Sequence, residues 1–159
     1  MASTLSSATM TVRVIESIKL NGTEQGAVNS STFSSINEIS KRILTITTAE
    51  STIATFSSAV ASAGHYVAAN VRYMRFTNKD DTNFITLTFR NQDNDEAAIK
   101  LDAGQSFIWN GDNDNGMTAV LNATEDADAA SSTNFGSLTN IQADADTASC
   151  DLEVFIASV

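Results

Sequence analysis

The chain contains no proline, one cysteine and one histidine among its 159 residues. A single cysteine excludes an internal disulfide, and Cys150 lies in an alternating segment, SCDLEVFIASV, where we expect it to be buried and unreactive. With no proline and only seven glycines, asparagine and aspartate must form most of the turns, and Asn21-Gly22 is a strong turn signal. Cysteine and histidine are too few for a zinc-ligand spacing.

Basic residues and long apolar runs are also scarce. Nine Lys and Arg stand against nineteen Asp and Glu, which gives a net charge of −10 and a pI of about 4.3. Nucleic-acid binding needs a basic face, so we expect no nucleic-acid partner. The apolar runs are too short for a membrane-spanning helix, and the first ten residues lack the pattern of a secretory signal. We expect a flexible N-terminal arm at residues 1–9 and a single domain at 10–159.

The sequence does contain short alternating segments separated by Asn, Asp and Gly. Both faces of residues 71–77 are of mixed polarity, which is typical of a central strand in a two-layer fold. Residues 85–90 alternate apolar with Thr and Arg, as in a half-buried strand. With the segments at 97–101 and 105–110, they predict an antiparallel meander across residues 69–109.

The remaining segments extend this pattern. Residues 10–20 predict a strand with a bulge, and the polar residues 23–37 predict a long loop. Residues 38–48 and 52–58 predict a hairpin, and the C-terminal segment 152–158 predicts a strand inserted in a sheet. Eight to ten short strands with frequent turns predict an all-β fold, an antiparallel β-sandwich or jelly roll.

Candidate catalytic groups lack partners. His65 is the only histidine, and no Gly-x-Ser-x-Gly motif accompanies it, so we expect no catalytic triad. Trp109 lies in a strand pattern that favours core packing. Two aspartate pairs have the composition of a glycosidase pair, but they lie in Ala-, Ser- and Thr-rich segments that favour a solvated rim: Asp126 with Asp128, and Asp144 with Asp146. We therefore expect no enzyme, and a hydrolase acting through His65 is the least favoured hypothesis.

The segment NGDNDNG at 110–116 suggests calcium, because alternate carboxylates can converge on a hard cation. An EF-hand that starts at Asp112 fails, since Gly116 falls at loop position five and Ala123 stands where a bidentate Glu is required. A looser calcium site remains an alternative, with Asp112 and Asp114 as its first ligands and Asp126 or Asp128 as further ones. Otherwise we expect no metal and no cofactor.

The segment VRYMRFTNKDDTNFITLTFRNQDNDEAAIKLDAGQSFIWNG resembles small β-sandwich virion structural proteins of tailed bacteriophages, of the capsid decoration (cement) type. The resemblance covers about a quarter of the chain. It implies a homo-oligomer, a dimer or trimer, that binds the major capsid protein or other virion proteins and stabilises the capsid from outside. The alternatives are a tail, neck or fibre component of the virion and a calcium-dependent carbohydrate or adhesion module.

Two segments are candidates for the docking surface. The small polar residues at the N-terminus could become ordered on binding, and the mixed face of residues 71–77 could meet a neighbour. The residues concerned are Ala2, Ser3, Thr4 and Leu5 in the first segment, and Val71, Tyr73 and Arg75 in the second.

Overall fold

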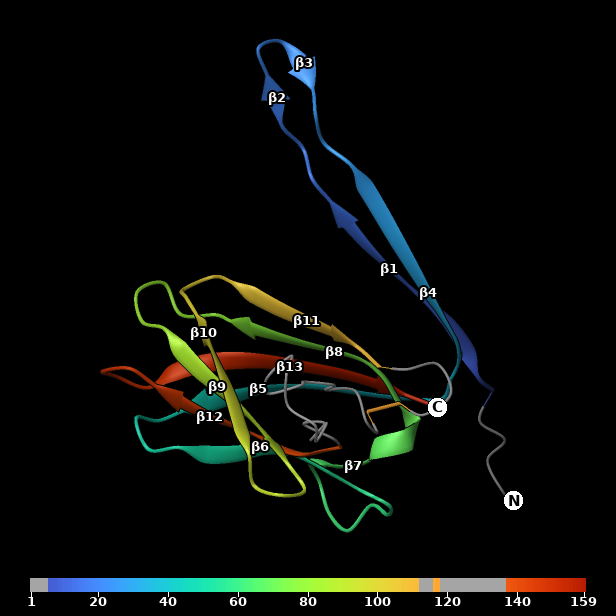
Figure 1. The fold of residues 1–159 in the computed structure, drawn as a ribbon, viewed down its shortest axis with the longest axis vertical. Coiled ribbons are helices and arrows are strands. Elements are labelled where there is room, and N and C mark those ends of the chain that lie inside the picture. The colour runs from blue at the N-terminus through green and yellow to red at the C-terminus, as the bar shows by residue number, and fades with distance from the viewer. Residues whose placement is uncertain (1–5, 112–115, 118–136) are drawn as a thin grey trace, which may run out of the picture.

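The computed structural model describes residues 6–111, 116–117 and 137–159, and almost all of the ordered structure in them is β. Two sheets of five and four strands face each other, and a long hairpin projects from one end of this sandwich (Figure 1). The all-β sandwich predicted from the sequence is confirmed. No helix in the described ranges is long and apolar enough to cross a membrane.

The five-stranded sheet has the order β10-β9-β12-β6-β7. All of its neighbouring strands are antiparallel except β6 and β7, which run parallel. Its strands are β6 (Ser51–Ser57), β7 (His65–Val67), β9 (Ile85–Asn91), β10 (Glu96–Leu101) and β12 (Leu138–Ala145). The single-turn helix η1 (Ala68–Asn70) joins β7 to the other sheet.

The four-stranded sheet is antiparallel throughout and has the order β11-β8-β13-β5. Its strands are β5 (Glu38–Ile46), β8 (Val71–Asn78), β11 (Ser106–Asn110) and β13 (Cys150–Ser158). The C-terminal strand β13 lies between β8 and β5, so the prediction that the chain ends inside a sheet is confirmed.

The predicted meander over residues 69–109 is wrong in its pairing. β8 and β9 belong to different sheets, and only β9 and β10 form a hairpin before the chain returns to β11 beside β8. The loop after β8 therefore crosses from one layer to the other. The buried amide of Asn78 fixes this crossing, since its Nδ2 donates to the main-chain oxygens of Asn83 (2.8 Å) and Leu101 (3.1 Å).

Two further predictions fail for related reasons. β5 and β6 do not form a hairpin, because they lie in opposite sheets. The polar segment predicted as a loop contains a nine-residue strand, β4 (Val28–Ile36). That strand is exposed along most of its length, so the alternation that marks a half-buried strand is absent from its sequence.

The core fills the space between the two sheets. Its largest fully buried side chains come from both layers, among them Met74, Phe76 and Ile156 from one sheet and Leu87 and Ile141 from the other. The predicted inward residues of β9, Ile85, Leu87 and Phe89, lie in this core. Of those predicted for β10, Leu101 lies in the core and Ile99 packs against it, but Ala97 is exposed near the end of the sheet. Trp109 packs against it from β11 and is partly exposed, which agrees with the core role expected for it.

Candidate protein-docking site

The projecting hairpin comprises residues 8–36 and consists of two antiparallel pairs. β1 (Ala8–Ile15) pairs with β4, and further out β2 (Lys19–Leu20) pairs with β3 (Thr23–Glu24). Figure 1 shows the hairpin leaving the sandwich beside the C-terminus and carrying its tip away from both sheets. Because no other described strand pairs with β1 or β4, both outer edges of the hairpin are unpaired within the described chain.

Local backbone geometry and hydrogen bonds fix the conformation of the hairpin tip. Asn21 and Gly22 both have positive φ (51° and 82°), as a two-residue type I′ turn requires, so the predicted turn is confirmed. Behind it, Glu24 Oε1 accepts hydrogen bonds from the main-chain nitrogens of Ile18 (3.2 Å) and Gly26 (3.1 Å). A Cβ on Gly26 would overlap the carbonyl oxygen of Glu16, so this close approach needs glycine.

The outer part of the projecting hairpin exposes apolar side chains that a solvated turn does not need. Ile15 and Val28 form a cross-strand pair and are 67% and 64% exposed. The other three exposed apolar residues are Val14, Ile18 and Leu20. An exposed, ordered apolar surface of this kind is typical of a protein-binding element.

The base of the hairpin packs on the outer face of the four-stranded sheet. Phe33 is 6% exposed and its ring lies 5.8 Å from that of Tyr73, which in turn contacts the edge of the Phe155 ring at 6.0 Å. These residues form a second apolar cluster, separate from the sandwich core, with Met10, Val12, Ile36, Ala157 and Val159. A cleft of about 260 Å³ opens beside this base, where β1 diverges from Arg75 and its neighbours.

The rest of that outer face is uncovered in the described chain, and it combines isoleucines with paired charges. Glu153 binds Arg75 (2.5 Å) and Lys41 (3.4 Å) at its centre. The hydrogen bond from Arg75 holds the pKa of the Glu153 carboxyl below its usual value, so the pair is ionised at neutral pH. Exposed isoleucines flank this centre: Ile39 and Ile43 on β5, and Ile108 on β11.

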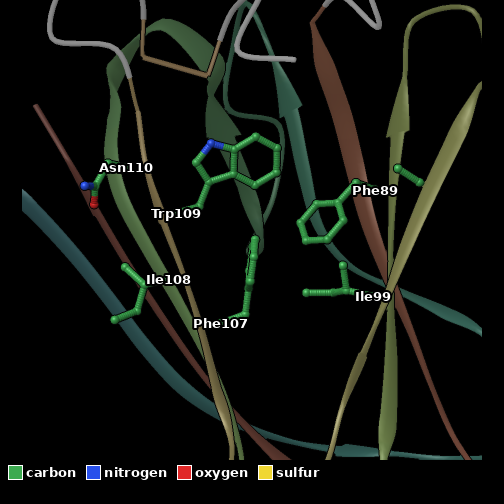
Figure 2. A pocket seen from close by; sticks show the side chains of 7 residues that line it. Phe89, Ile99, Phe107, Ile108, Trp109 and Asn110 are labelled. Atoms are coloured by element: carbon green, nitrogen blue, oxygen red, sulfur yellow. The ribbon is translucent and has the colours of Figure 1, made fainter. Parts of the chain in front are cut away.

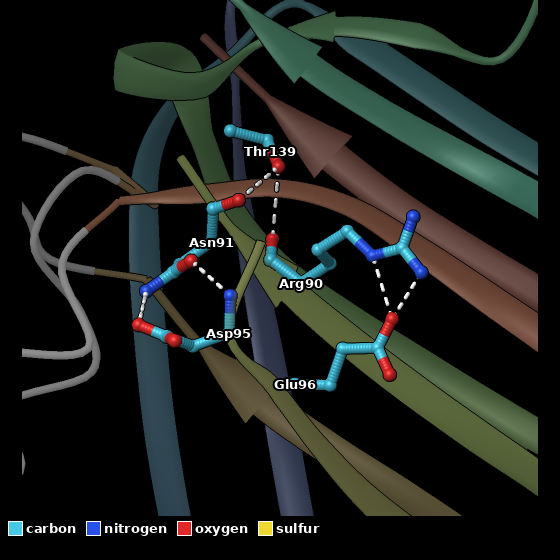
Figure 3. Close-up of polar contacts among 5 residues, drawn as sticks. All are labelled: Arg90, Asn91, Asp95, Glu96 and Thr139. Carbon is cyan, nitrogen blue, oxygen red and sulfur yellow. Dashed lines mark hydrogen bonds and ion pairs between the residues drawn. The ribbon is translucent and has the colours of Figure 1, made fainter. Parts of the chain in front are cut away.

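The outer face of the five-stranded sheet is different in kind. It presents Thr, Arg, Gln, Glu and Lys side chains, and none of the exposed large apolar residues lies on it. Figure 3 shows its end, where the guanidinium of Arg90 pairs with Glu96 and the Asn91 Oδ1 accepts a hydrogen bond from the main-chain nitrogen of Asp95 (2.8 Å). The Thr139 hydroxyl donates to the main-chain oxygens of Arg90 (3.0 Å) and Asn91 (2.9 Å), the last two residues of β9. This face has the character of a solvated surface.

An aromatic cleft lies at one open side of the sandwich, between β9 and β10 of one sheet and β11 of the other. Figure 2 shows Phe89, Phe107 and Trp109 around it, with Ile99 on the opposite strand. The Phe89 ring lies 5.5 Å from Phe107 and 5.1 Å from Trp109, so the rings pack tilted and edge-on against one another. The cleft measures about 320 Å³, and its lining is mostly apolar.

The structure separates the residues predicted for docking. Val71 belongs to the sandwich core, and Tyr73 is buried beneath the base of the projecting hairpin. Arg75 is partly exposed and takes part in the ion pair with Glu153. The N-terminal candidates, Ala2, Ser3, Thr4 and Leu5, lie outside the described residues, as do the calcium candidates Asp112, Asp114, Asp126 and Asp128.

The candidate reactive groups lie apart from one another. His65 is in the edge strand β7, in a polar cleft beside Arg42 and Thr55. Cys150 is 1% exposed, as predicted, and burial raises the pKa of its thiol, which keeps it protonated and weakly nucleophilic. Within the described ranges, no group of three or more His, Cys, Asp or Glu side chains is placed to hold a metal ion.

The projecting hairpin was not predicted from the sequence, which indicated a strand followed by a long loop. The signal that could have found it is the Asn21-Gly22 turn flanked by Ile18 and Leu20, with Ile15 and Val28 at matching distances on either side. Comparison of the chain with protein-family models, with curated proteins and with solved structures found no significant match in any of the three.

Proposed function

We propose that this chain is a structural protein of a virion, a capsid decoration protein that is present in many copies and stabilises the shell from outside. The observation that carries the proposal is the projecting hairpin, an ordered element whose exposed apolar residues serve no purpose within the described chain. An ordered hairpin loses less conformational entropy on docking than a disordered segment does, which suits a protein that is held by many small contacts.

Three features support a structural role over a catalytic one. The sequence over residues 71–111 resembles phage virion β-sandwich proteins. The clefts of the described residues are lined by core side chains or by isolated polar groups, and His65 lies apart from Cys150 on the opposite sheet. The strong negative charge favours solubility at the high local concentrations of assembly.

Particles that lack the protein provide the test. Adding the purified chain should restore binding at a stoichiometry in the hundreds per particle and should raise the temperature at which the genome is released. Electron microscopy should place it on the outer capsid surface. A few copies at the tail or neck would replace the decoration role with the tail alternative, and failure to bind any particle would refute a virion role.

The aromatic cleft supports one second candidate, a carbohydrate-binding or adhesion module. Sugars stack on exposed aromatic faces, and Trp109 is the only tryptophan, so its fluorescence reports directly on this cleft. Titration with a panel of glycans, with and without millimolar calcium, should change that fluorescence if the candidate is right. An unchanged spectrum and an unchanged melting temperature would reject both the glycan site and the calcium requirement.

A further inference from the structure

We infer that the projecting hairpin of one copy packs against the outer face of the four-stranded sheet of a second copy, with each copy giving one hairpin and receiving one. The inference rests on the proposed function to the extent that it takes the hairpin to be an assembly element. It names the occupant of that surface, a second copy of this chain, and the face that receives it.

The distribution of exposed apolar residues points to these two surfaces. Of the nine large apolar residues exposed in the described ranges, five lie on the hairpin and three on the outer face of the four-stranded sheet. The ninth, Val60, lies in the loop before β7. The outer face of the five-stranded sheet has none. One chain therefore carries both an apolar projection and an apolar receiving face, which is what self-association requires.

The hairpin and the receiving face are also alike in having no net charge. The hairpin carries two basic and two acidic residues, and the receiving face also carries two of each. They are Arg13, Lys19, Glu16 and Glu24 on the hairpin, and Lys41, Arg75, Asp151 and Glu153 on the face. The entire net charge of −10 therefore lies elsewhere on the chain. Two strongly acidic molecules can approach one another most easily through surfaces that are themselves neutral.

The area of the hairpin determines whether one hairpin–face contact is enough for a stable complex. From Arg13 to Asn21 its free part is nine residues long, about 30 Å at roughly 3.3 Å per residue, and two strands are about 10 Å wide. One face of the hairpin therefore covers about 300 Å². A single contact buries about 600 Å² over both partners, which is too little for a stable complex, whereas a reciprocal exchange buries about 1,200 Å², the lower end of the stable range.

The receiving face also contains a cleft that offers a first contact site for the partner's hairpin. The cleft beside the base of the hairpin lies between Val12 of β1 and Arg75 and Phe155 of the sheet, and Arg75 belongs to the uncovered part of the face. A partner strand that entered here would continue the apolar cluster formed by Phe33, Tyr73 and Phe155. The partner contact would thus extend an apolar surface that the chain's own hairpin has already started to cover.

Sedimentation of the purified chain over a range from about 1 to 100 μM, a span that brackets micromolar affinity, tests the association without any particle. The wild type should form a dimer, because only two copies that exchange hairpins bury the larger area. Leu20→Asp on the hairpin and Ile43→Asp on the face should each raise the dissociation constant at least tenfold. Both side chains are exposed, so both variants should fold. Two matched controls add the same charge at exposed positions outside the proposed contact, Ser34→Asp at the base of the hairpin and Ala98→Asp on the five-stranded sheet, and they should leave the association unchanged.

Cysteine cross-linking identifies the surfaces. When Leu20→Cys copies are mixed with Ile43→Cys or Ile108→Cys copies, we expect disulfides between the two kinds of copy. We expect none with Ala98→Cys copies. The native Cys150 is buried and stays out of the reaction. Faster cross-linking of Leu20→Cys copies to one another would show that hairpins pack on hairpins and would overturn the assigned face.

The salt dependence of the association distinguishes a second copy of this chain from a basic partner. Association of two acidic chains through neutral apolar surfaces should strengthen as salt screens their repulsion, whereas docking on a basic surface should weaken. A wild-type chain that is monomeric at every concentration and salt level but still binds particles would overturn this inference and leave the proposed function standing. An oligomer that does not bind particles would support this inference and refute the proposed function.

Discussion

Replacing Phe33 with alanine should detach the projecting hairpin without unfolding the sandwich. Phe33 is 6% exposed and packs on Tyr73 in a cluster that has only four buried members. A buried Phe→Ala change costs about 3–5 kcal/mol, and the adjoining cleft lets water reach the space left behind, so we expect the lower end of that range. Because this cluster is separate from the sandwich core, the loss should fall on the hairpin's attachment.

The size of the effect can be measured by hydrogen exchange. A two-stranded hairpin is only marginally stable when nothing packs against it, so the amides of β1 and β4 should exchange once the base is released. A loss of about 3 kcal/mol corresponds to an exchange rate faster by on the order of 100-fold. Peptides from β9 and β13 should keep the exchange rates they have in the wild type.

Val28→Ala is the matched control for this measurement. It shortens another apolar side chain of β4, but Val28 is 64% exposed and lies beyond the contact with the sheet. We expect little change in exchange at the base of the hairpin. Equal acceleration in β13 would refute the reasoning, since it would mean that the hairpin and the sandwich unfold as one unit. No acceleration in β1 would show that the apolar cluster does not hold the hairpin.

Three other changes test separate parts of the structure. Asn78→Ala should lower the free energy of unfolding by about 2 kcal/mol in a urea titration, because it leaves two main-chain oxygens unpaired at the crossing between the sheets. A loss below about 0.5 kcal/mol would contradict that role. Gly26→Ala should speed exchange at the hairpin tip by forcing a methyl group against the Glu16 carbonyl, while the melting temperature of the sandwich stays the same. Glu153→Gln should change the pH dependence of stability. The pKa of Glu153 is lowered by Arg75, so its charge stabilises the fold above its unfolded pKa and this contribution is lost as pH falls below about 4.5. The wild type should therefore exceed the variant in urea midpoint at pH 7, and this advantage should shrink as the pH is lowered toward 3. An advantage of the same size at both pH values would contradict the ion pair.

The strands of the sandwich could be found from the sequence because their alternation reports burial on one side. Ile85, Leu87 and Phe89 all point into the core as predicted, and Cys150 is buried as expected. The pairing partners of these strands could not be found in the same way. A strand that turns back into its own sheet and one that crosses to the opposite sheet have the same alternation, so the meander was predicted where the chain crosses between layers.

The projecting hairpin escaped prediction for the opposite reason. β4 contains the run VNSSTFSSI, in which only Phe33 and Ile36 are buried, so neither helical nor strand periodicity is visible. The same absence of contacts that hid this strand leaves Ile15 and Val28 exposed in the described chain. Of the docking residues predicted on β8, Arg75 lies on the proposed receiving face, whereas Tyr73 is covered by the hairpin's base and Val71 lies in the sandwich core.

The all-β class, the inward residues of most strands, the Asn21-Gly22 turn and the acidic charge could be read from the sequence, because each of these depends on neighbours in the chain or on composition alone. Three features became visible only in the folded chain: which strands share a sheet, which face of the four-stranded sheet stays uncovered, and that residues 8–36 leave the sandwich as a hairpin. These features depend on contacts between residues far apart in the chain, such as Phe33 with Tyr73, and local patterns carry no record of such distant pairings.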